Sequence, residues 1–135
     1  MNHWLVKSEP DCWSWQDHVK KGVEPWDGVR NYQASNFMKE MTVGDQAFFY
    51  HSGKERAVVG ILEVVKEAYP DPSDASNRFM MVDFKALDPL QQPVTLKEIK
   101  SDERLSDIAL VTQARLSVMP IDDAAWQIIC AKGGL

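Results

Sequence analysis

The sequence has few cysteines and lacks the residue spacings that hold metal ions or phosphates. Cys12 and Cys130 lie near opposite ends with no CxxC pair, which argues against a zinc site and favours reduced thiols, while a bond between the two stays open. The three histidines form no HExxH or similar spacing, and neither GxGxxG nor GxxxxGK[ST] occurs. We therefore expect no metal and no cofactor. The sequence also has no signature of a redox enzyme or of a nucleotide-hydrolysing enzyme.

Long apolar runs are also missing. No stretch approaches the roughly 18 residues that a membrane helix needs, and the start "MNHWLVKSEP" lacks the basic and apolar blocks of a secretory signal. We expect a cytoplasmic protein with no membrane partner. The length of 135 residues, with 44% hydrophobic and 26% charged residues, predicts one folded domain over residues 1–135.

Positive charge is not in excess, because the formal net charge at pH 7 is -5. The general attraction to a phosphate backbone that dominates non-specific nucleic-acid binding is therefore absent, and any such contact must be local. Scattered surface charge is the ordinary explanation of the basic residues, which gather at Lys20–Lys21, Arg30, Lys54–Arg56, Arg78 and Arg115.

Four patterns predict helices. Ser14 and Asp17 resemble a capping box before a helix through Lys21 that ends at Gly22, with Trp15 and Val19 on one face. The apolar spacing of Ala34, Phe37, Met38 and Met41 predicts a second helix, for which Asn31 is a candidate N-cap. Thr95 with Glu98 opens a helix over "TLKEIKSDERL", and Asp122 caps a final helix that ends at Gly133.

The remaining patterns predict strands. They cover residues 3–7, 46–52, the apolar run "RAVVGILEVVKEA", "FMMVDFKAL" and "ARLSVMPI". Gly60 inside the apolar run indicates a bulge or a close approach to the strand, and "YPDPSDASNR" reads as a surface loop. Strands at both ends of the chain around a β meander predict an α+β fold, a mixed β barrel or strongly curved sheet with short flanking helices.

A catalytic interpretation rests on two serines. His51 and Ser52 resemble a base and a nucleophile, but neighbours on a strand point to opposite faces and cannot pair directly. Ser8 lies between Lys7 and Glu9, and GxSxG is absent. A small-molecule hydrolase or transferase that uses Ser8 or Ser52 is the alternative hypothesis.

A binding interpretation uses the same segments better. Aromatic faces stack on a flat base for about 1–3 kcal/mol, and short polar groups read its edge. Trp26, Tyr32 and Tyr50 can supply faces, while Ser8, Asn31 and Ser52 can supply edges. Each has a structural alternative: Trp26 can be core, as we expect for Trp13, Trp15 and Trp126, Asn31 can be only a helix cap, and Arg30 can pair with Asp27 or Glu24.

The motifs "WLVKSEP", "WDGVRNYQASN", "GDQAFFYHS", "VVGILEVV" and "ARLSVMPI" occur in an order and spacing that resemble the EVE domain family, from about residue 3 to residue 130. The resemblance implies a PUA-like fold related to YTH domains. It also implies a non-catalytic reader of a modified base in DNA or RNA, on a single strand or with the base flipped out of a duplex. An interaction module without a working pocket is a further alternative.

Carried over position by position, the resemblance implies that Lys7 and Ser8 line the mouth of the pocket and that Trp26 forms an aromatic wall. It places Arg30 and Asn31 on a phosphate and a base edge, Tyr50, His51 and Ser52 on the barrel side, and Ser117 as the closing residue. The YTH pocket is a cage of several tryptophans, whereas only Trp26 here lies in a matching motif. Methyladenine is therefore not implied, and a modified cytosine fits equally well.

Overall fold

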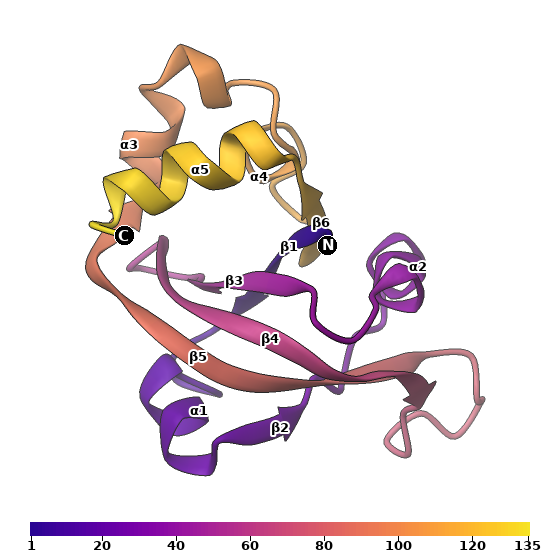
Figure 1. Cartoon of the computed structure of the whole chain (residues 1–135). Coiled ribbons are helices and arrows are strands. Elements are labelled where there is room, and N and C mark those ends of the chain that lie inside the picture. Colours follow the sequence, from indigo (N-terminus) through magenta and orange to yellow (C-terminus); the bar gives the residue numbers. More distant parts are fainter.

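A computed structural model describes all 135 residues, and its centre is a six-stranded mixed sheet in the order β2-β5-β4-β3-β1-β6 (Figure 1). β1 runs parallel to β3, and every other neighbouring pair is antiparallel. The sheet curls strongly without closing, so the curved-sheet form of the predicted α+β fold is confirmed and the closed-barrel form is not adopted. The elements are β1 (His3–Ser8), α1 (Trp15–Lys21), β2 (Val23–Pro25), α2 (Tyr32–Glu40), β3 (Gln46–His51), β4 (Ala57–Pro70), β5 (Met80–Thr95), α3 (Leu96–Lys100), the 3-10 turn η1 (Glu103–Leu105), α4 (Ala109–Thr112), β6 (Val118–Ile121) and α5 (Asp123–Lys132).

The predicted helix starts are confirmed, because each cap side chain accepts a hydrogen bond from a backbone N–H of the first turn. Ser14 accepts from Asp17 at 3.1 Å, and the reciprocal bond of the capping box is present. The Asn31, Thr95 and Asp122 side chains cap α2, α3 and α5 in the same way. These local bonds satisfy backbone donors that would otherwise have no partner, which explains why sequence alone locates them.

Several boundaries differ from the predictions. β2 and α4 are short elements that no pattern indicated, and β6 begins only at Val118. β5 is longer than predicted and continues past Pro89 and Pro93 to Thr95. Because β2 pairs with β5 only at residues 83–85, the rest of β5 has β4 as its single neighbour, and proline is tolerated on such an edge.

The buried face of α1 is also different from the predicted one. Trp15 and His18 point into the protein, whereas Val19 is 51% exposed. An imidazole can take this position because both of its ring nitrogens have hydrogen-bond partners, at Trp13 and at the Phe84 carbonyl.

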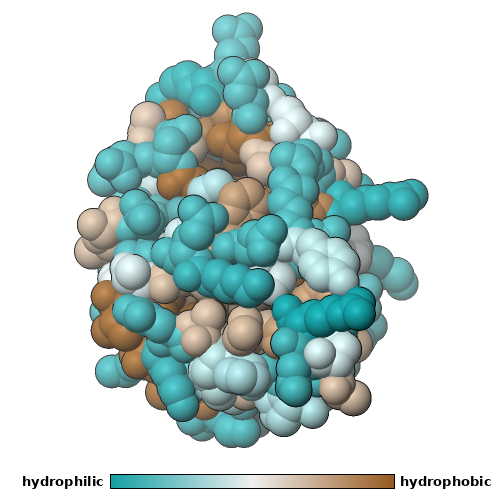
Figure 2. All heavy atoms as spheres, turned by 90° about the vertical axis from the view of Figure 1, so that its right-hand side faces the viewer, coloured by the Kyte–Doolittle hydropathy of each residue, from teal (hydrophilic) through white to brown (hydrophobic).

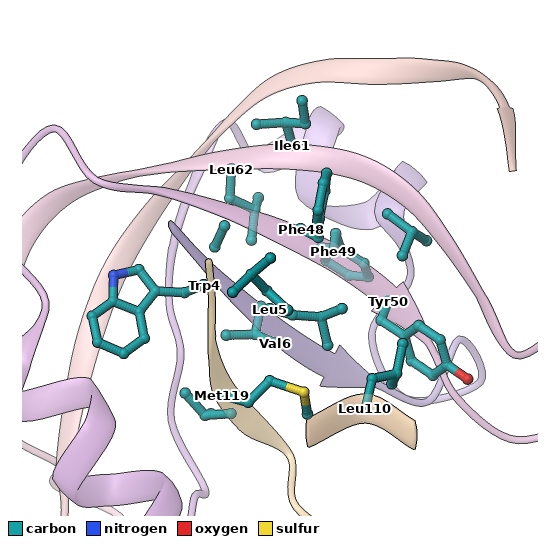
Figure 3. Close-up of a cluster of buried hydrophobic side chains, with 14 of the residues drawn as sticks. Trp4, Leu5, Val6, Phe48, Phe49, Tyr50, Ile61, Leu62, Leu110 and Met119 are labelled. Atoms are coloured by element: carbon teal, nitrogen blue, oxygen red, sulfur yellow. The ribbon is translucent and has the colours of Figure 1, made fainter. Parts of the chain in front are cut away.

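One hydrophobic core holds the sheet to its helices. Leu5 and Val6 of β1 lie beside Phe48 and Phe49 of β3, with Met119 of β6 next to them (Figure 3). On the side where α3 and α5 lie, Trp126 stacks on Phe48 with ring centroids 3.8 Å apart. α1 and β2 cover the opposite side, at the bottom of Figure 1, and the pocket described below lies there.

Gly60 marks a close approach, as its place in the strand predicted. A Cβ built on it would lie 2.6 Å from ring atoms of Trp15, so only glycine leaves room for the indole. The pairing of β4 with β5 also shifts between Val58 and Gly60.

The surface offers little apolar area on the face that carries α2. Hydrophilic side chains cover most of it, and the hydrophobic patches between them are small (Figure 2). None of the helices combines the length and the hydrophobicity of a membrane-spanning segment.

Candidate functional site

A pocket of about 330 Å³ opens between the end of β1, the segment before α1, and β2 with the residues that follow it. This volume is at the lower end of the range for small-ligand sites. Its lining residues are Lys7, Ser8, Cys12, Trp13, Glu24, Pro25, Trp26 and Asp27. A larger hollow of about 620 Å³ near α3 has no hydrophobic lining residue, so it offers no face on which a flat ligand could stack.

Trp26 is both a core residue and a wall of this pocket. It follows β2, and its backbone N–H donates to the Val82 carbonyl at 2.7 Å, which extends the pairing with β5. Its indole packs edge-on against Phe49 and Phe84, with centroids 5.4 and 5.7 Å away. Only 8% of the residue is exposed, so the core fixes the orientation of the surface that faces the pocket.

Trp13 is the second aromatic residue of the lining, and its predicted place in the core is wrong. It is only partly buried, and its indole N–H donates to Nδ1 of His18 at 3.0 Å. His18 in turn lies 6.1 Å from Trp26, ring centroid to centroid. Burial lowers the pKa of His18, although the hydrogen bond to Phe84 and the charge of Glu24 act in the opposite direction. The buried, neutral imidazole therefore links the two indoles.

Lys7 and Ser8 supply polar groups at the end of β1. The Lys7 ammonium donates to the Ala114 carbonyl at 2.9 Å, and burial lowers the pKa of this lysine. The Ser8 hydroxyl donates to the Trp13 carbonyl at 2.6 Å, which ties the strand to the segment that carries Trp13. Both residues line the pocket.

Two carboxylates complete the lining. Glu24 is paired with Lys21 at 2.9 Å and retains 23% side-chain exposure, whereas Asp27 is exposed. Carboxylate oxygens accept hydrogen bonds, and in nucleic-acid recognition they accept from the exocyclic amine of cytosine. An aromatic wall beside such acceptors suits a flat ligand that carries an amino group.

Arg30 does not reach this pocket. Its guanidinium donates to Asp71 at 3.3 Å and to Ser73 at 2.9 Å, so the predicted ion pair with Asp27 or Glu24 is replaced by one to the β4–β5 loop. The same Asp71 oxygen accepts from the N–H of Gly28, whose φ of 77° favours glycine. Burial works to raise the pKa of Asp71, but hydrogen bonds from Ser73, Gly28 and Arg30 together hold it below its usual range.

The aromatic and amide candidates next to Arg30 also lie outside the pocket lining. The Asn31 side-chain oxygen accepts from Ala34 at 2.9 Å as the cap of α2. Tyr32 is 59% exposed, lies on Phe79 and accepts a long hydrogen bond from Arg78. Asn31 instead lines a separate hollow with Gln33 and the segment 113–116.

The candidate residues around the end of β3 do not line this pocket. Tyr50 is buried, its ring centroid is 5.7 Å from the Lys7 ammonium, and burial raises its pKa. His51 accepts from the Trp15 N–H at 3.0 Å, and its other nitrogen pairs with Glu55 at 2.7 Å, so no ring nitrogen is left for Ser52. The Ser117 carbonyl accepts from the Lys7 N–H, which extends the hydrogen bonding between β1 and β6 to the residue before β6 begins.

Sequence reasoning missed Trp13, His18 and Asp71 as parts of this site. Their signals were present but weak: Trp13 lies five residues after Ser8, and Asp71 follows a Tyr-Pro pair in a polar loop. Nothing in the local pattern connects Asp71 to Gly28, 43 residues away, since that contact depends on how β4 and β5 pair.

The sequence-family model of the EVE domain matches residues 2–132 of this chain. The chain belongs to the EVE domain family. It is 33% identical to human thymocyte nuclear protein 1 over 95% of this chain and 72% of that protein, and 39% identical to the Danio rerio protein of that name over 95% and 70%.

Among solved structures, this EVE domain is similar to an Agrobacterium tumefaciens protein, with 44% identity, a TM-score of 0.96 and coverage of 100% of this chain and 94% of that one. It is also similar to human THYN1 protein in complex with 5-methylcytosine-containing DNA, with 32% identity, a TM-score of 0.93 and coverage of 100% and 99%. The expectation of a cytoplasmic protein is wrong by this comparison, because the named vertebrate relatives are nuclear proteins.

Proposed function

We propose that this EVE domain is a binding module that holds a modified cytosine of a DNA strand in the pocket between Trp13 and Trp26, without acting on it chemically. The observation that carries the proposal is that two independent findings agree. The pocket combines indole surface with hydrogen-bonding side chains, and a relative with the same fold over its whole length is described in complex with 5-methylcytosine-containing DNA.

The pocket chemistry supports a pyrimidine that bears an amino group. Trp26, and Trp13 where it faces the pocket, provide stacking surface, and stacking contributes about 1–3 kcal/mol per base. Glu24 and Asp27 provide acceptors for the exocyclic amine of cytosine, whereas the corresponding position of thymine is a carbonyl oxygen that a carboxylate repels. Lys7 provides a donor at the same mouth.

A base can enter a pocket of this kind only outside the stack. Extrusion from a duplex costs a few kcal/mol, and this cost is absent for a single strand. A single-stranded or flipped base is therefore the proposed ligand, and RNA is a second carrier that the test distinguishes from DNA.

The proposed contacts are Lys7, Ser8, Trp26, Trp13, Glu24 and Asp27. The other residues that the sequence indicated act as supports in this proposal: Arg30, Asn31, Tyr32, Tyr50, His51, Ser52 and Ser117. The alternative of a hydrolase or transferase is not favoured, because the Ser8 hydroxyl donates to a carbonyl and both nitrogens of His51 have other partners.

Calorimetry with short single-stranded oligonucleotides tests the proposal. Each oligonucleotide carries one 5-methylcytosine, cytosine, thymine or N6-methyladenine, in DNA and in RNA. We expect tightest binding to 5-methylcytosine, and a loss of about five- to 150-fold for Trp13→Ala, which corresponds to about 1–3 kcal/mol of stacking. Trp26→Phe is the milder change at the core position, since Trp26→Ala would cost about 3–5 kcal/mol of stability.

Glu24→Gln and Asp27→Asn separate recognition of the amine from stacking. We expect each to reduce the preference for cytosine bases over thymine, with Asp88→Asn, an exposed carboxylate outside the pocket, as the matched control. Equal affinity for all four bases in the wild-type protein would refute the proposal.

A further inference from the structure

Four cations without ion-pair partners gather on one surface of this acidic domain. Lys54 and Arg56 come from the β3–β4 turn, and Lys97 and Lys100 come from α3. They lie around a hollow of about 510 Å³ whose lining residues are Lys54, Glu55, Arg56, Thr95, Leu96, Lys97, Lys100 and Ser101, and we call it the basic groove.

Positive charge is in excess in the basic groove, because its lining holds four cations and one carboxylate, Glu55. None of its four cations lies within 4.0 Å of a carboxylate, whereas Lys21, Arg30, Arg104 and Lys132 are all paired. The one acidic residue of the lining, Glu55, accepts from His51 at 2.7 Å. In a chain with a net charge of -5, a local excess of positive charge of this kind indicates an anionic partner.

The two halves of the basic groove are held together by backbone pairing. The Leu96 N–H donates to the Arg56 carbonyl at 2.8 Å, and Ala57 lies opposite Thr95 in the register of β4 and β5. The α3 helix begins at that point because Thr95 caps it. The backbone positions that carry the cations are therefore fixed by the fold, although the side chains are exposed.

The basic groove adjoins the pocket through the β3–β4 turn. Ser8, which lines the pocket, lies opposite His51, and its carbonyl accepts from the N–H of Ser52, the first residue after β3. His51 also accepts from the N–H of Trp15 at the start of α1. In Figure 1 this turn lies at the left, between α1 below and α3 above.

We propose that the basic groove binds phosphates of the strand whose modified base occupies the pocket. The inference rests on the proposed function. A strand leaving the mouth at Ser8 passes the β3–β4 turn first and α3 next, and so meets the four cations in a row. The four local cations would thus provide phosphate contacts, although the net charge of the chain is negative and gives no general attraction to phosphates.

The test compares two triple variants with the same loss of charge. The groove variant, Lys54→Gln/Lys97→Gln/Lys100→Gln, loses three of the four positive charges of the basic groove. The control variant, Lys20→Gln/Lys39→Gln/Lys85→Gln, loses three exposed, unpaired lysines elsewhere. Affinity for a single-stranded DNA oligonucleotide with one 5-methylcytosine is measured against salt concentration. All substituted residues are exposed, and circular dichroism checks that both variants fold.

We expect the groove variant to bind at least tenfold more weakly at low salt. Its slope of log affinity against log salt should be shallower by about 2, since each neutralised phosphate on a single strand contributes about 0.7. The control variant should keep the wild-type slope, and the ratio of affinities for methylated and unmethylated strands should be the same in both variants.

Other outcomes separate the two proposals. Equal slopes for the two variants, with a preserved preference for the methylated base, overturn the groove and leave the pocket standing. Wild-type binding with no base preference, but with a slope that depends on the groove, overturns the pocket alone. No binding to any strand overturns both.

Discussion

The indole N–H of Trp13 donates to Nδ1 of His18 at 3.0 Å, so one wall of the pocket is held by a histidine with no exposed surface. The other ring nitrogen of His18 lies 2.8 Å from the Phe84 carbonyl, which can only accept. The proton must therefore be on Nε2, which leaves Nδ1 free to accept from the indole. A second proton on this ring would place one donor against another, so the geometry of the wall depends on neutral His18.

Acidification is expected to destabilise the protein through His18. Burial lowers its pKa in the folded state, whereas in the unfolded chain the pKa is about 6.5. As the pH falls below about 6.5, the unfolded chain binds a proton that the folded protein excludes, so the free energy of unfolding decreases by at most ~1.4 kcal/mol per pH unit; above that pH this contribution is complete.

Urea unfolding between pH 8 and pH 5 measures this dependence. His18→Gln, which can still donate to the Phe84 carbonyl and accept from the Trp13 indole, should remove most of the slope. The same steep slope in that variant would mean that another group is responsible.

Asp71→Asn should loosen the segment that follows Trp26. The Asp71 carboxylate has no exposed surface and accepts from Gly28, Arg30 and Ser73, and an amide can replace only part of these bonds. We expect a loss of about 1–3 kcal/mol in the free energy of unfolding, together with weaker binding of the methylated oligonucleotide. Asp88→Asn serves as control, and an equal effect of both variants would contradict the anchoring role.

Gly60→Ala should be destabilising because the new methyl group would lie 2.6 Å from the buried indole of Trp15. Overpacking of this kind costs about 1–3 kcal/mol, measured by thermal or urea unfolding. Gly133→Ala is the comparison, since the atom nearest to its methyl group would be the Leu90 Cδ1, at 2.9 Å, which belongs to a flexible side chain. Trp15→Phe combined with Gly60→Ala should cost less than the sum of the two single changes.

Alkylation of Cys12 should block the pocket. Cys12 is exposed and part of the lining, whereas Cys130 is partly buried and burial raises the pKa of its thiol. Because the thiolate is the reactive form, we expect N-ethylmaleimide at pH 7 to modify Cys12 first, as followed by mass spectrometry, and binding of the methylated oligonucleotide to fall in parallel. Cys12→Ser should bind and resist the reagent, while Cys130→Ser should remain sensitive; unimpaired binding by protein modified at Cys12 would contradict the location of the site.

Much of the fold was predictable from short segments. The caps at Ser14, Asn31, Thr95 and Asp122 form hydrogen bonds to residues three positions away, so they depend only on neighbours in the chain. Alternation and apolar runs located the central strands, since side-chain direction repeats every two residues. Short elements such as β2 were not predicted, because a three-residue strand has too few positions to show a period.

The sequence indicated residues of the candidate site only where they lie in one of its recognisable motifs. The amino-acid sequence by itself determined that Lys7, Ser8 and Trp26 belong to motifs typical of EVE domains, and that the local elements around them form. The tertiary structure alone decided that Trp13 lines the pocket instead of the core, that Arg30 pairs with Asp71, 41 residues away, and that α3 brings lysines to the β3–β4 turn. The reason is physical: local hydrogen bonds and periodicity fix the backbone of each segment, but contacts between distant side chains depend on strand register and on which groups the core buries, and no single segment contains that information.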